Sequence, residues 1–139
     1  VTVARTCVKL AVGGDRLAPG TLGCRGVVPG RAVPWSVPMV TRSGVGVKKR
    51  RLLDWQKFVG LYAGIAMGRR PPYAGPVRLA LRFTLRPRGG RQPDATNLQK
   101  GVEDSIQGII ISNDSQVCEV RTVRASGTED QTTIEVVAL

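Results

Sequence analysis

The residues that could carry out chemistry are concentrated in one short stretch, from Asp94 to Val117. It contains three aspartates, one lysine and two asparagines: Asp94, Asp104, Asp114, Lys100, Asn97 and Asn113. Oxygen ligands suit Mg²⁺, which usually binds one or two carboxylates together with waters and a substrate phosphate. Metal-assisted hydrolysis of a phosphodiester needs no histidine, and the chain has none. Asp94 and Asp114 are therefore candidate metal ligands, and Lys100 could orient the water or neutralise the developing charge.

The element that must position these groups is a helix, predicted from about Asn97 to Gln107. Asp94 or Thr96 can cap its start, and Gly108 ends it. At 100° per residue one face is largely apolar, and the opposite face is polar: Leu98, Val102, Ser105 and Ile106 against Asn97, Lys100 and Asp104. An Asp cap with a polar helix face is also a common structural arrangement, so the residues alone leave catalysis and structure as alternatives.

A short apolar run, Ile109 to Ile111, follows the helix and should be buried. It would return Asn113 and Asp114 to a fixed place at its end. We therefore expect Asp94 and Asp114 to come together, with Lys100 on the helix face between them.

Around this stretch the patterns predict further elements. A strand near 25–29 precedes a proline-rich irregular arm, and an amphipathic helix follows with the stripe Leu52, Trp55, Val59, Tyr62 and Ala66. Trp55 and Tyr62 are expected in the core because they lie on this stripe. Residues 76–86 alternate apolar and polar side chains as a strand does, and 115–125 and 131–139 are two further strands, with 126–130 as a hairpin loop between them.

The order of these elements predicts a mixed α/β or α+β domain, with a mixed sheet packed against two main helices. It covers residues 25–139, and residues 1–24 are expected to be an N-terminal extension of uncertain order. At 139 residues the chain fits one domain.

The charge of the chain, +11, is unevenly placed. Residues 1–91 hold 18 of the 21 Lys and Arg and only two acids, whereas residues 92–139 hold the other eight acids. Such a field favours a polyanionic partner, most commonly nucleic acid. Carboxylates clustered in a DNA-binding protein would repel phosphate unless metal ions lie between them. A basic protein in which arginine is merely frequent is the alternative.

Arginines with a plausible role in DNA binding lie on and after the 76–86 strand. Arg78, Arg82 and Arg86 recur every four residues, roughly 13 Å apart, on its polar face. Arg88 and Arg91 follow in a basic loop. A solvated sheet face explains the row about equally well. The run Lys48-Lys-Arg-Arg51 could likewise contact phosphates or form a solvated helix start.

Several classes of protein are disfavoured. Three cysteines without C-x-x-C spacing suggest neither a disulfide framework nor a zinc site, so a reducing cytoplasm is the default expectation. No apolar run approaches the roughly 18 residues of a membrane helix. No glycine-rich phosphate loop is present, so no small-molecule cofactor is expected.

The spacing from Pro93 to Val117 resembles that of the RusA family of Holliday junction resolvases. The resemblance lies in Pro93-Asp-Ala-Thr-Asn-Leu-Gln-Lys100, then Asp104, Gly108 and Asn113-Asp-Ser-Gln-Val117. The usual pattern is P-D-x-D-N-x-x-K, an Asp in the following helix, and D-D-x-Q-[IV]. More loosely, the resemblance extends over the elements from Gly26 onward.

The resemblance implies a small, intertwined homodimeric endonuclease that depends on Mg²⁺, for which Mn²⁺ may substitute. Such an enzyme cuts four-way DNA junctions symmetrically in recombination and repair, and is often encoded by phages or prophages. By position, Asp94 and Asp114 would bind metal and Lys100 would be the catalytic lysine. Asn97 would support them, and Asp104 would be a further ligand or would support the ligands.

Two positions depart from the family pattern. Thr96 stands where most members have a second Asp, and Asn113 replaces the first Asp of the later pair. Both still offer oxygen atoms to the site, but each removes a negative charge. A catalytically weakened protein of the same fold that binds branched DNA is therefore the alternative. A small RNA-binding protein, suggested by charge alone, would leave the spacing unexplained.

Overall fold

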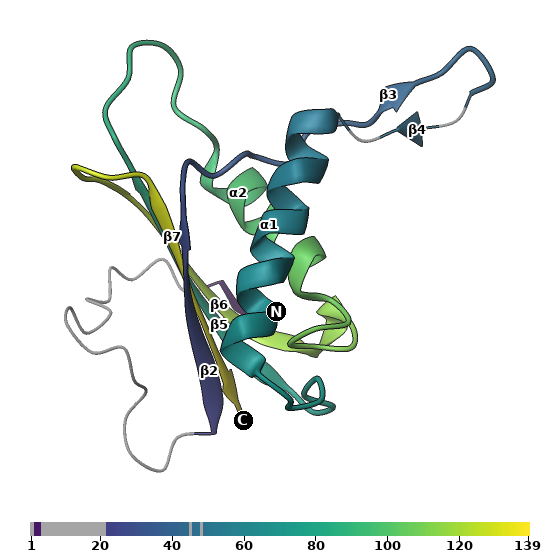
Figure 1. The fold of residues 1–139 in the computed structure, drawn as a ribbon, viewed down its shortest axis with the longest axis vertical. Helices are drawn as coiled ribbons and strands as arrows, with labels where there is room; N and C mark the ends of the chain where they lie inside the picture. The colour runs from purple at the N-terminus through teal and green to yellow at the C-terminus, as the bar shows by residue number, and fades with distance from the viewer. Residues whose placement is uncertain (1, 4–21, 45, 48) are drawn as a thin grey trace.

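The computed structural model describes residues 2–3, 22–44, 46–47 and 49–139 (Figure 1). A five-stranded mixed sheet has the order β1-β6-β5-β7-β2, and two helices pack on one of its faces. The strands of this sheet are β1 (Thr2–Val3), β2 (Gly23–Pro29), β5 (Val77–Leu85), β6 (Val117–Ser126) and β7 (Gln131–Ala138). The helices are α1 (Arg50–Met67) and α2 (Ala95–Ile106), and the single turn of 3₁₀ helix is η1 (Asp114–Gln116). The predicted fold class is confirmed.

Both helices form where the sequence patterns predict them. On α1, Leu52, Trp55 and Val59 are buried in the core, and Gly68 ends the helix with a φ of 61° and an N–H that donates to the carbonyl of Gly64. Tyr62 is partly buried against the same core. On α2, the apolar face is buried as expected, through Leu98, Gly101, Val102 and Ile106. These faces hold the helices against the sheet because burying them removes apolar surface from water.

Strand β5 is the centre of the sheet. It pairs in parallel with β6 and antiparallel with β7, and its residues Val77, Leu79, Leu81, Phe83 and Leu85 are at most 3 % exposed. Because side chains alternate along a strand, Arg78 and Arg82 project from the opposite face, away from the helices. Both are half-buried, and Arg78 lies 4.0 Å from Glu119 on β6.

The predicted hairpin between the last two strands is wrong. β6 and β7 do not pair, because β5 lies between them, and residues 127–130 cross the end of β5 instead. The N–H of Gly127 donates to the carbonyl of Leu85, and the N–H of Arg86 donates to the Asp130 carboxylate at 2.7 Å. The more apolar β5 takes the central position, where both of its edges are hydrogen-bonded.

The proline-rich arm after β2 carries a second, small sheet. β3 (Met39–Val40) pairs antiparallel with β4 (Gly46–Val47), and this ribbon projects beyond the start of α1 (Figure 1). The expectation of an extension over residues 1–24 falls mostly outside the described residues. Of those described, Thr2 and Val3 pair in parallel with β6, and Gly23 already belongs to β2. Neither described helix combines the length and hydropathy needed to cross a membrane.

Candidate active site

Asp94 is the N-cap of α2. Its Oδ1 accepts a hydrogen bond from the N–H of Thr96 at 2.9 Å, which satisfies one of the free donors at the start of the helix. Asp94 is exposed, and its other carboxylate oxygen has no hydrogen-bond partner among the described residues. The cap therefore fixes the carboxylate while leaving one oxygen for a ligand.

Lys100 lies on α2 six residues after Asp94, nearly two turns further along, above the ring of Trp35. Its Nζ is 3.5 Å from the ring centroid, a cation–π contact that holds the ammonium group. The arm carrying Trp35 is fixed to the helix, because the N–H of Trp35 donates to the carbonyl of Asn97 at 2.9 Å. Gly101 packs closely under the same arm, because a Cβ there would lie 3.5 Å from the carbonyl oxygen of Val33, at ordinary contact distance.

Asp114 lies in a turn that is held by several hydrogen bonds. Of the run predicted to be buried, Ile110 and Ile111 are buried and Ile109 is partly buried. η1 follows with a capping box in which the Asn113 side chain accepts from the N–H of Ser115. The oxygen of Asn113 is thus used for capping, which an Asp would do equally well. The Asp114 carboxylate is exposed and has no hydrogen-bond partner among the described residues.

Gln116 anchors the same turn. Its Oε1 accepts from the N–H groups of Ser112 and Asn113, and its Nε2 donates to the carbonyls of Tyr73 and Gly75. All four bonds are between 2.6 and 2.9 Å. Sequence reasoning did not single out Gln116 as a site residue, although its place in the motif was visible.

Within one chain Asp94 lies at the start of α2, whereas Asp114 follows a turn that packs at its last turn. Asp114 is close enough to Glu103, in the last turn of α2, for the two charges to interact. Burial raises the pKa of Glu103, a hydrogen bond from Gln99 opposes this, and the negative charges of Asp114 and Asp104 raise the pKa further. Glu103 lies nine residues after Asp94, about 14 Å along the helix axis. Among the described residues, no three Asp, Glu or Cys form a metal-binding group.

Two cavities, each of about 550 Å³, meet at Asp94. The first lies between the 31–35 arm and the 88–93 loop, and its polar lining residues are Arg31, Arg51, Arg88, Arg91, Gln92, Asp94 and Asn97. The second lies toward β6 and is lined by Arg91, Gln92, Asp94, Ala95, Thr96, Thr122 and Arg124. Asp94 is thus a carboxylate on a rim shared by two arginine-rich cavities.

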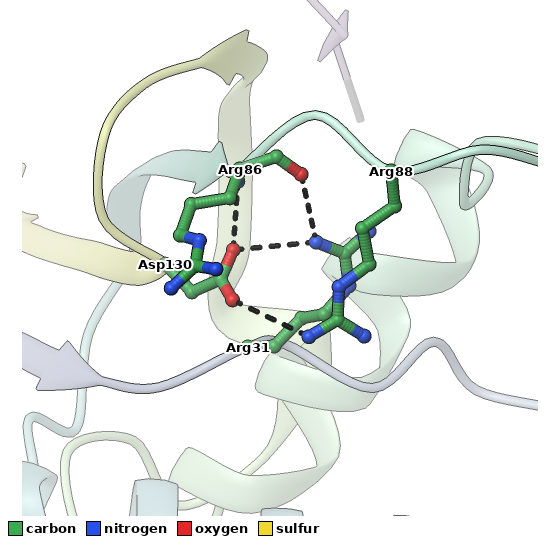
Figure 2. A network of polar contacts seen from close by, with 4 residues as sticks. All are labelled: Arg31, Arg86, Arg88 and Asp130. Atoms are coloured by element: carbon green, nitrogen blue, oxygen red, sulfur yellow. Dashed lines mark hydrogen bonds and ion pairs between the residues drawn. The ribbon is translucent and has the colours of Figure 1, made fainter.

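Asp130 interacts with Arg31 and Arg88, two residues that line the first cavity (Figure 2). Its Oδ1 accepts from the backbone N–H of Arg86 at 2.7 Å and from Nη1 of Arg31 at 3.2 Å, and its Oδ2 lies 4.0 Å from Nη2 of Arg88. Nη1 of Arg31 also donates to the carbonyl of Arg86. The hydrogen bond from the Arg86 N–H is the largest effect that lowers the pKa of Asp130, and the surrounding arginines add to it.

The structure separates the predicted DNA-binding arginines into two groups. Arg88 and Arg91 line the cavity beside Asp94, whereas Arg78 and Arg82 lie on the helix-free face of the sheet. The backbone of Arg86 belongs to the Asp130 network, and its side chain is exposed. Arg31 and Asp130 were missed by sequence reasoning, and 99 residues of sequence separate them.

The donors present fit a hard divalent cation. Asp94 and Asp114 each offer an exposed carboxylate with no hydrogen-bond donor on at least one oxygen among the described residues. Mg²⁺ needs only one or two protein carboxylates when waters and a phosphate complete its octahedron. Thr96 adds a hydroxyl beside Asp94, and the charges of Asp104 and Asp114 both act on Glu103.

Comparison with known proteins gives one family. The model described as endodeoxyribonuclease RusA matches residues 29–137, from the end of β2 to the end of β7. No curated protein matches the sequence. The match covers α2, the turn with Asp114 and both cavities beside Asp94, so it includes every candidate site residue named above. The chain belongs to the RusA family of endodeoxyribonucleases.

Proposed function

We propose that the protein is a Mg²⁺-dependent endonuclease that resolves four-way DNA junctions by paired, symmetric nicking. The observation that carries this proposal is Asp94, a fixed and exposed carboxylate between two arginine-rich cavities in a chain of the RusA family. A carboxylate there would repel a phosphodiester on its own. It becomes useful when a cation lies between it and the phosphate.

In this proposal each residue has a separate role. Asp94 and Asp114 hold Mg²⁺, and the bound ion supplies an activated water and stabilises charge on the attacked phosphate. Lys100, held by Trp35, faces the developing charge or orients the water. Thr96 and Asn97 support Asp94 with polar groups, and Asp104 supports Asp114. Asn113 supports Asp114 through the cap that fixes its turn.

We also propose that the active unit is a two-fold homodimer, the commonest oligomer. A four-way junction presents two strands to be cut, and each chain carries one set of site residues. Asp94 and Asp114 lie toward opposite ends of α2, which supports a metal centre shared between the two protomers. Such a centre takes Asp94 from one protomer and Asp114 from its partner. Two such centres arise in the dimer by symmetry.

A cleavage assay on a synthetic four-way junction tests this function. We expect paired nicks with Mg²⁺, none in EDTA, and little cutting of a linear duplex of the same sequence. A Lys100→Met variant should bind the junction and cleave at least about a hundredfold more slowly, as expected for loss of a group that stabilises transition-state charge. Cleavage of duplex and junction at equal rates would refute junction specificity.

The second candidate function is binding of branched DNA without cleavage. It is favoured by Thr96 and Asn113, which each remove one negative charge relative to the family pattern. Tight junction binding that weakens steeply with salt, together with no product under Mg²⁺ or Mn²⁺, would select this function. Replacing Thr96 by Asp would then be expected to restore cleavage.

A further inference from the structure

The first cavity beside Asp94 has the charge of an anion site. Four arginines and one carboxylate line it: Arg31, Arg51, Arg88, Arg91 and Asp94. In the part of the chain that the structure describes, neither Arg51 nor Arg91 forms an ion pair or a side-chain hydrogen bond. Their charges are therefore free to interact with a ligand.

Asp130 lies behind this cavity and pairs with Arg31 and, more loosely, with Arg88, two of the four arginines that line it. Asp130 accepts hydrogen bonds from the Arg86 backbone and from Arg31, and its side chain is only 13 % exposed. It fixes Nη1 of Arg31, whose other guanidinium nitrogens have no hydrogen-bond partner among the described residues (Figure 2). Asp130 thus positions Arg31. The cavity stays positive because its four arginines outnumber the two carboxylates, Asp94 and Asp130.

Three separate segments bring these arginines together. Arg31 comes from the arm after β2, Arg51 from the first turn of α1, and Arg88 and Arg91 from the loop between β5 and α2. Asn97 and the start of α2 complete the wall, and the positive end of the helix dipole adds to the field. A cavity of about 550 Å³ has room for a phosphate group and its sugar neighbours.

We propose that this cavity binds a backbone phosphate of the DNA strand that is cut, next along the strand to the phosphate at Asp94. Arg51 and Arg91 contact that phosphate, and Asp130 is the positioning residue that fixes Arg31 beside it. The inference rests on the proposed function for the identity of the strand. It assigns a role to Arg31, Arg51 and Asp130 that neither the sequence motif nor the family match assigns.

The test measures junction binding without Mg²⁺, so that cleavage plays no part. Arg51→Gln and Arg91→Gln each remove an exposed charge in the cavity, and Arg69→Gln removes a charge that is also exposed but lies beyond the far end of α1. For each cavity variant, the slope of log K against log [salt] should become shallower by about 0.9, the loss of one phosphate contact. Arg69→Gln should keep the parent slope.

A single methylphosphonate, which carries no charge, then locates the phosphate when it is moved along the strand. At one position it should weaken binding by the parent protein and have no added effect on Arg51→Gln. Equal slopes for the cavity variants and Arg69→Gln, or additive effects at every methylphosphonate position, would overturn the proposal. A protein that passes these tests but never cleaves would refute the proposed function and leave the phosphate site standing.

Discussion

Replacing Asp130 by Ala should destabilise the fold by about 2 kcal/mol. The main loss is the 2.7 Å hydrogen bond from the Arg86 N–H to a charged carboxylate, a type of bond that contributes about 1.5–3 kcal/mol. The ion pair with Arg31 adds to it, because the two side chains are 15 % and 13 % exposed. The contact with Arg88, at 4.0 Å and with 56 % of the arginine exposed, adds little.

Thermal unfolding of parent and variant measures this loss. For a domain of this length, about 2 kcal/mol corresponds to a fall in Tm of about 6–10 °C. Glu129→Ala is the matched control, because Glu129 is an exposed neighbouring acid that makes no ion pair among the described residues. Its effect should stay within about 0.5 kcal/mol. Equal Tm values for Asp130→Ala and Glu129→Ala would refute the role of Asp130 in joining the arm, the loop and the β6–β7 link.

The difference in unfolding free energy between parent and Asp130→Ala should depend on pH in a definite direction. The folded protein lowers the pKa of Asp130 from its ordinary value of 3.8, so the carboxylate stabilises the fold above that pH. The stabilisation is lost as the pH falls from 3.8 through the lower folded pKa. The difference in unfolding free energy between parent and Asp130→Ala should therefore be constant near pH 6 and shrink below about pH 4. A difference that grows on acidification would contradict this assignment.

Two further predictions concern the turns that hold the site. Gly127→Ala should lower the free energy of unfolding in urea by about 1–3 kcal/mol, because its Cβ would overlap with Cγ2 of Thr84. Adding Thr84→Ser removes that methyl group and should recover most of the loss; no recovery would refute the steric cause. Gln116→Ala removes four hydrogen bonds, so it should lower stability by about 2–3 kcal/mol and slow cleavage. Gln116→Glu keeps the two acceptor bonds and should be intermediate in stability. Equal stability of parent and Gln116→Ala would show that Gln116 does not anchor the turn.

Local patterns in the sequence predicted the elements that carry the site. The alternation along β5 predicted its buried face, and the Asp94 cap and the apolar face of α2 follow from short-range rules. The burial of Ile110 and Ile111 was likewise readable from a short apolar run. In each case the interacting residues are close in sequence.

Contacts between distant segments were not predictable in the same way. The insertion of β5 between β6 and β7 depends on which strand edges pair, and side-chain alternation carries no information about partners. The pairing of Arg31 with Asp130 and the contact of Trp35 with Lys100 join segments far apart in the chain. The expected meeting of Asp94 and Asp114 assumed that the 109–111 run returns to the start of α2, but it stays near the last turn.

The central claim is that Asp94 of one protomer and Asp114 of its partner form one centre, and complementation tests it most directly. Asp94→Asn and Asp114→Asn are prepared separately and as a mixed dimer, and each is incubated with a four-way junction and Mg²⁺. Each homodimer should bind the junction without cutting it. The mixed dimer retains one intact centre and should nick a single strand. A mixed dimer that stays as inactive as its parents, while still binding the junction, would contradict the shared centre.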